Sequence, residues 1–204
     1  MPWSQALRMP TLVGVLSLGI LAGILVAGTV VVGQDPSAGD RGSQQLLDEL
    51  VAKDAIREQI YNYGRGLDRM DKPLALSVFH SDATVAIGAE MTGAEWVESA
   101  WRTHEQIAAH SHQMTNILIK VDGDTAVSES YFMASLRAEP TSETANTTLH
   151  VGRYVDRWSK RSGRWAMDHR AIVVDFRTTH VSTGPNPPSA GRRDTTDPSY
   201  QIYR

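Results

Sequence analysis

Two histidines near the middle of the chain have a spacing that suits proton transfer. His110 and His112 are separated by one residue, in a stretch where polar and apolar side chains alternate as they do in a β-strand. Alternate residues of a strand face the same side, so both imidazoles are expected on one face. A neutral imidazole titrates near neutral pH and can remove a proton and return it. A strand histidine is also commonly a half-buried surface residue, so the spacing alone does not define a site.

Three helices are expected before these histidines. The first begins at Ser43 and the second covers 72–79, where Pro73 is tolerated in the first turn. The third covers 94–109. Gly64 and Gly66 are expected to loosen the end of the first helix. The apolar residues of the first helix recur at close to 3.6-residue spacing: Leu46, Leu47, Leu50, Val51, Ile56, Ile60, Tyr63 and Leu67.

Antiparallel strands are expected to follow the helices. A short strand at 82–87 precedes the third helix, and longer ones cover 110–121, 125–137, 150–160 and 164–177. Asp122-Gly123-Asp124 is typical of a tight hairpin, and 161–163 forms the last turn. Helices followed by a run of long strands predict an α+β fold, with a curved, mostly antiparallel sheet over three N-terminal helices.

The two ends of the chain differ in composition from this middle part. Residues 1–33 contain no acidic residue, and 11–33 carry no charge, which is typical of a membrane anchor or of a signal peptide. A leader added by a misassigned start codon is the alternative. We expect export to the periplasm or the outside of the cell, with a possible tether at 11–33. Residues 34–43 have linker composition, and 179–204 are expected to form an extended tail.

Composition excludes several kinds of function. The chain has no cysteine, so it has no disulfide, thiolate metal site or thiol nucleophile. Its formal net charge is −3 and it has no basic stripe, which argues against nucleic acid as a partner. A His-x-His pair can also bind a metal, but the sequence shows no obvious third ligand, and we expect no metal.

Several short motifs resemble the SnoaL-like branch of the nuclear-transport-factor-2-like (NTF2-like) superfamily. Its members include scytalone dehydratase, bile-acid 7α-dehydratase and hexachlorocyclohexane dehydrochlorinase. The resemblance covers residues 44–178 and implies a cone-shaped fold that uses no cofactor. The motifs are Tyr63-Gly-Arg-Gly-Leu-Asp68, Phe79-His-Ser-Asp82, Thr92-Gly93, His112-Gln-Met-Thr-Asn116, Gly152-Arg-Tyr-Val-Asp156, Gly163-Arg-Trp165 and His169-Arg170.

The resemblance implies that Asp68 and His112 form a catalytic pair. In such a pair the carboxylate fixes the tautomer of the imidazole and stabilises the imidazolium that forms. The His-x-x-x-Asn pattern favours His112 over His110, which is expected at the mouth of the same cavity. An Asp after a helix is otherwise a common cap or turn residue.

Tyr63 and Arg170 match positions that contact the substrate or stabilise negative charge in relatives. Residues five apart on an ideal helix differ by about 140°, so Tyr63 and Asp68 share a pocket only if the helix breaks. Tyr61 is the alternative tyrosine, and either can simply be a core aromatic. An inward Arg170 needs a carboxylate such as Asp68, whereas an outward one would form a cross-strand pair.

We therefore expect a lyase or isomerase, dehydratase- or cyclase-like, that acts on a small hydrophobic substrate, which can be cyclic. The alternatives are a binding or interaction module and a small subunit of a ring-hydroxylating oxygenase. The resemblance also implies a homodimer or homotrimer. The residues expected in the apolar wall of the pocket are Trp96, Trp101, Met114, Tyr131, Phe132 and Met133.

Overall fold

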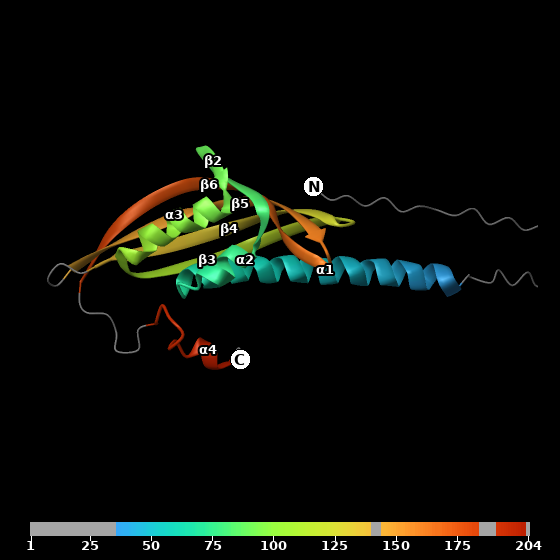
Figure 1. Cartoon of the computed structure of the whole chain (residues 1–204), viewed down its shortest axis with the longest axis horizontal. Coiled ribbons are helices and arrows are strands. Elements are labelled where there is room, and N and C mark those ends of the chain that lie inside the picture. The colour runs from blue at the N-terminus through green and yellow to red at the C-terminus, as the bar shows by residue number, and fades with distance from the viewer. Residues whose placement is uncertain (1–35, 140–143, 184–190, 203–204) are drawn as a thin grey trace, which may run out of the picture. The chain divides into compact units, whose positions relative to one another are not determined.

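The computed structural model describes residues 36–139, 144–183 and 191–202, and it has the α+β fold that the sequence predicts (Figure 1). Six strands form one sheet in the order β2-β1-β6-β5-β4-β3. All neighbouring pairs are antiparallel except β1 and β6, which are parallel. The helices are α1 (Pro36–Asp68), α2 (Lys72–Ser77), α3 (Gly93–Glu105) and α4 (Ser199–Ile202). The strands are β1 (Phe79–Ile87), β2 (Ala89–Thr92), β3 (Ile107–Asp122), β4 (Thr125–Ala138), β5 (Thr144–Arg161) and β6 (Arg164–Thr183).

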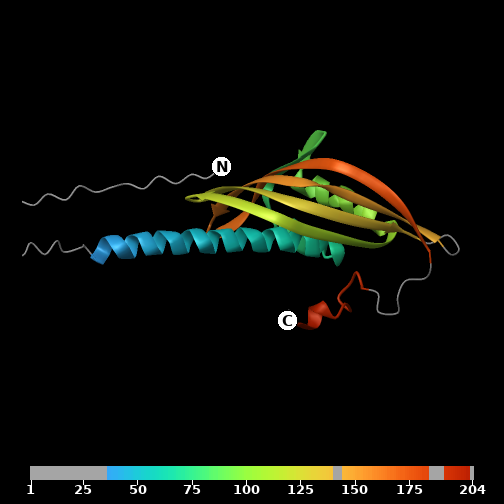
Figure 2. The ribbon, with the colours of Figure 1, turned by 180° about the vertical axis from the view of Figure 1, so that it is seen from behind.

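Helix α1 is longer and more regular than predicted. It begins at Pro36, so residues 36–43 are helical rather than linker, and it runs without a break through Gly64 and Gly66. Proline is well suited to the first turn of a helix, because its missing N–H has no partner there. The N-terminal part of α1 extends beyond the β3–β4 turn (Figures 1 and 2). Four apolar residues in this part are therefore more than half exposed: Leu46, Leu47, Leu50 and Val51.

The second half of α1 forms the core. Ile56, Ile60, Tyr63 and Leu67 are almost completely buried, at the i, i+4, i+7 and i+11 positions of one helix face. They pack with residues of the concave side of the sheet, such as Trp158.

Helix α1 lies very close to α2 at Gly66. A Cβ atom added at Gly66 would lie 2.6 Å from the backbone nitrogen of Ala75 and 2.9 Å from its Cα atom. Asp71 accepts a hydrogen bond from the backbone N–H of Leu74 and caps α2. The missing side chain thus lets the capped start of α2 lie against the last turn of α1.

Gly66→Ala is expected to lower the free energy of unfolding by about 1–3 kcal/mol, since backbone atoms must move to admit the methyl group. Gly42→Ala is the matched control in the same helix. A Cβ atom there meets nothing within 4 Å, so helix propensity should raise stability by about 0.5–1 kcal/mol. Urea denaturation of both variants measures the difference. Equal effects at the two glycines would contradict the close packing of α1 against α2.

Helix α3 is shorter than predicted because its end becomes part of the sheet. Thr92 and Glu95 form a capping box at its start, with the Thr92 side chain accepting from the Glu95 N–H at 3.2 Å. The helix ends at Glu105, and 107–109 belong to β3 rather than to the helix. Most strands are also longer than predicted, and β2, which pairs with β1, was not predicted.

The C-terminal segment is not simply extended. Strand β6 continues to Thr183, beyond the predicted domain boundary at 178, and pairs with β5 up to that residue. Residues 191–202 then form turns and the short helix α4. No helix in the described part of the chain is long and apolar enough to cross a membrane. The predicted leader at 1–33 lies outside the described residues.

Candidate active site

Asp68 and His112 are in direct contact, as the sequence predicts. The Nδ1 atom of His112 lies 2.7 Å from Asp68 Oδ1, and the backbone N–H of His112 donates to both carboxylate oxygens, at 3.0 and 2.9 Å. An ionised carboxylate can only accept, so the hydrogen of this imidazole is assigned to Nδ1. Nε2 then carries the lone pair. The side chains of Asp68 and His112 are 15% and 6% exposed, so water screens the contact only weakly.

Asp68 is the last residue of α1 and His112 lies in β3, so their contact links the end of the helix to the strand. Tyr63 and Asp68 serve the same site without a helix break, because Asp68 does not line the cavity. The carboxylate holds His112, and it is the imidazole that lines the cavity.

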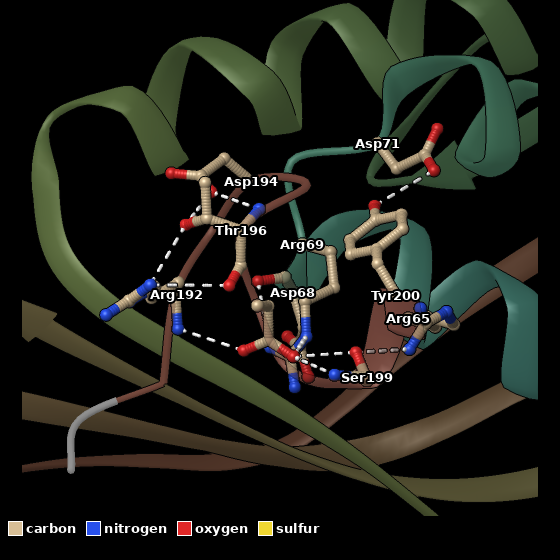
Figure 3. Close-up of polar contacts among 10 residues, drawn as sticks. Arg65, Asp68, Arg69, Asp71, Arg192, Asp194, Thr196, Ser199 and Tyr200 are labelled. Atoms are coloured by element: carbon tan, nitrogen blue, oxygen red, sulfur yellow. Dashed lines mark hydrogen bonds and ion pairs between the residues drawn. The ribbon is translucent and has the colours of Figure 1, made fainter. Parts of the chain in front are cut away.

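The C-terminal segment packs around the same end of α1 (Figure 3). Tyr200 donates a hydrogen bond from its hydroxyl to Asp71, and Arg65 donates to the hydroxyl of Ser199. Arg193 donates to the backbone carbonyl of His104 at 2.7 Å, at the end of α3. Three separate parts of the fold therefore meet beside Asp68: the end of α1, the end of α3 and the last residues of the described chain.

His112 lines a cavity of about 190 Å³ that is mostly apolar. The walls come from α1, α3 and the concave face of the sheet. The lining residues are Tyr63, Leu67, Ile87, Trp96, Ser99, Ala100, Thr103, His104, His112, Phe132, Ala134, Leu136, His150, Ile172 and Val174. A cavity of this kind suits a small hydrophobic ligand that is oriented by a few polar groups.

His110 faces the same side of β3 as His112 but does not line the cavity. Its Nε2 atom lies 2.8 Å from the backbone oxygen of Leu67, one of the last carbonyls of α1. Its ring stacks on that of His104 with centroids 4.3 Å apart, and His104 in turn lies 5.3 Å from the ring of His112. The predicted role of His110 at the mouth of the pocket is therefore wrong, because its ring is bonded to the Leu67 carbonyl of α1 instead.

His104 lines the cavity and was not predicted. Burial, with smaller effects of His110, His112 and Arg193, lowers its pKa to about 3. The pKa of His110 is lowered too, chiefly by burial. Both rings are therefore neutral at pH 7, and they add no positive charge beside His112.

Tyr63 and Trp96 line the cavity as predicted, but they also bond to each other. The indole N–H of Trp96 donates to the Tyr63 hydroxyl at 2.8 Å. Burial is the main reason that the pKa of Tyr63 is raised. This hydroxyl is thus neutral at pH 7, and one of its lone pairs is occupied by Trp96.

Arg170 points inward, but its partner is Asp156 rather than Asp68. The two residues face each other across β5 and β6, and the guanidinium donates to both carboxylate oxygens at 2.8 and 2.9 Å. Its Cζ atom lies 4.4 Å from the ring centroid of Tyr63 and 3.9 Å from that of Tyr154. Burial lowers the pKa of Arg170, but the charge of Asp156 outweighs it, and the net shift is upward. Arg170 does not line the cavity.

Four other residues predicted to bind substrate lie elsewhere. Tyr61 is 51% exposed on the outer side of α1. Tyr131 points away from the cavity, because on β4 it is the neighbouring Phe132 that faces inward. Trp101 is buried with the Lys72 ammonium 5.2 Å from its ring centroid, and Met114 packs against the core near Gly64.

His150, like His104, lines the cavity and was missed. Sequence periodicity contains a signal for each of them. His104 continues the buried stripe of α3 through Val97 and Trp101. His150 lies four residues before the buried Tyr154 on β5, so the two side chains face the same side of the strand. Among the described residues, no group of three or more His, Asp or Glu side chains is arranged to hold a metal ion.

Residues 48–171 match the model of the SnoaL-like domain, and the chain belongs to this family. A candidate scytalone dehydratase from Novosphingobium aromaticivorans has a similar structure. The identity is 22% over 70% of this chain and 97% of that one, with a TM-score of 0.57. The hexachlorocyclohexane dehydrochlorinase LinA-type3 from Novosphingobium barchaimii is 17% identical over 70% of this chain and 99% of its own, with a TM-score of 0.61. These likenesses confirm the NTF2-like fold. No protein of curated function matches the chain.

Proposed function

We propose that this protein is a cofactor-independent lyase or isomerase, dehydratase- or cyclase-like, in which His112 is the base. The observation that carries the proposal is the contact of His112 with Asp68 at the wall of an apolar cavity. Membership of the SnoaL-like family supports the same type of function. The similar structures that are named as a dehydratase and a dehydrochlorinase agree with it.

In the proposed reaction, Nε2 of His112 removes a proton from a carbon atom of the substrate. Asp68 holds the Nδ1–H and stabilises the imidazolium, which later returns its proton to the departing group or to another carbon. The apolar walls exclude water and strengthen these charge interactions. A small, mostly hydrophobic molecule fits the volume and the lining of the cavity.

The test uses 2-tetralone, a small cyclic ketone with acidic hydrogens next to its carbonyl group. Wild type and His112→Ala are incubated with it in D₂O, and ¹H NMR follows the exchange of these hydrogens for deuterium. Wild type should exceed the buffer rate, and His112→Ala should return to it. If both proteins exchange hydrogens at the same rate above the buffer rate, then His112 is not the base.

A non-catalytic binding module is the second candidate, and one observation favours it. Arg170, which the sequence offered as an electrophilic partner, is paired with Asp156 and does not line the cavity. A module of this kind would bind 2-tetralone with no exchange in either protein, and the contact between Asp68 and His112 would then be structural.

A further inference from the structure

Proton abstraction next to a carbonyl group needs a hydrogen-bond donor for the oxygen that becomes negative. Arg170 does not line the cavity, whereas the hydroxyl of Tyr63, which accepts from Trp96, can still donate its own hydrogen from the α1 side. Of the other polar residues that line the cavity, Ser99 and Thr103 belong to α3, where the Thr103 hydroxyl donates to the Ser99 backbone oxygen, and His104 is stacked on His110. His150 is the cavity residue that stands across from His112.

The sheet aligns these two histidines in one row. His112 lies opposite Ala134 on the neighbouring strand β4, and Ala134 lies opposite His150 on β5. Residues directly opposite in a sheet share a face, and neighbouring strands are about 4.8 Å apart, so the two backbones are separated by roughly 10 Å. All three residues line the cavity. The methyl group of Ala134 leaves room between the two rings for a flat ligand.

The ring of His150 can act as a hydrogen-bond donor because of its charge state and because no described residue already accepts its hydrogen. Burial, followed by Arg177 and His112, lowers its pKa, so the ring is neutral at pH 7 and carries one N–H. It forms no hydrogen bond with any residue of the described ranges. A neutral imidazole can polarise a carbonyl group by donating this N–H, and it does so without adding a positive charge to the cavity.

We propose that His150 is a catalytic residue that donates a hydrogen bond to the carbonyl oxygen of a small cyclic ketone, while His112 removes the α-hydrogen. This inference rests on the proposed function and adds a second catalytic residue to its site. The C–H electron pair forms the C=C bond of an enolate, whose oxygen stays hydrogen-bonded to His150. When the enolate collapses, the C=O bond forms again and the α-carbon takes a proton back from His112.

The first measurement is binding, which needs no turnover. 2-Tetralone and tetralin differ in the ketone oxygen, which only accepts hydrogen bonds. Wild type should bind the ketone about tenfold more tightly than the hydrocarbon. His150→Leu should lose this preference and still bind tetralin, whereas His150→Gln, which keeps an N–H donor, should retain it. Calorimetry with the full chain gives all six affinities.

The second measurement is hydrogen exchange of 2-tetralone at saturation. His150→Leu should lower the rate roughly 100-fold, and His150→Gln should restore most of it. If wild type exchanges hydrogens and His150→Leu matches it in both rate and ketone preference, the inference is overturned while the proposed function stands. If no protein exchanges hydrogens but His150→Leu loses the ketone preference, the proposed function fails while His150 remains the residue that binds the oxygen.

Discussion

Arg170→Met should lower the free energy of unfolding by about 3–5 kcal/mol, because it leaves Asp156 as an unpaired charge in the core. Both side chains are completely buried, and the guanidinium bonds to both carboxylate oxygens. Methionine fills part of the space but cannot donate to the carboxylate. Urea denaturation of the full chain, followed by tryptophan fluorescence, measures the change.

Arg153→Met is the matched control on the neighbouring strand β5. Arg153 contacts Glu129 and Asp175 at 3.5 and 3.4 Å, with all three side chains partly exposed, so its loss should cost no more than about 1 kcal/mol. In a double variant, Asp156→Leu should recover part of the stability lost in Arg170→Met, because it removes the unpaired charge. Equal losses in the two single variants would mean that burial does not increase the contribution of the Arg170–Asp156 pair to the free energy of unfolding.

Asp68→Asn should reduce the exchange of 2-tetralone hydrogens roughly 100- to 10,000-fold with little change in its binding. The amide can accept the backbone N–H of His112, so the fold is kept. It cannot stabilise an imidazolium by charge, and it no longer fixes the hydrogen on Nδ1. Since Asp68 does not line the cavity, the ligand loses no contact.

Asp82→Asn provides the control for the loss of one carboxylate. Asp82 is exposed on β1 and pairs with Arg161, away from the cavity. Its replacement should leave the exchange rate unchanged. If Asp68→Asn exchanges hydrogens as fast as Asp82→Asn, the carboxylate beside His112 contributes nothing to the reaction.

The pair of Asp68 and His112 was predictable because local patterns placed both residues. Strand alternation located His112, and a family motif located Asp68 at the end of α1. The partner of Arg170 was not predictable in the same way. Whether it meets Asp156 or Asp68 depends on the register between β5 and β6 and on the register shift between Arg157 and Trp158. A register is set by the packing of the whole sheet.

The same limit explains why His150 was missed. Its position opposite Ala134 depends on the register between β4 and β5, and β5 starts at Thr144 rather than at His150. The length of helix α1 was underestimated for a different reason. Serine, glycine and aspartate at 37–43 are weak helix formers on average, and composition alone suggested a linker. Here they continue a helix that the core stabilises further along.

The contacts of the C-terminal segment with α1 bear on the order in which the protein is assembled. Ribosomes make a chain from its N-terminus, and parts of a protein can fold while synthesis continues. Arg65 and Asp71 are made before the whole sheet, whereas their partners Ser199 and Tyr200 are made after it. The end of α1 that carries Asp68 therefore lacks these contacts while the strands are made, and it gains them only after Ser199 and Tyr200 have left the ribosome.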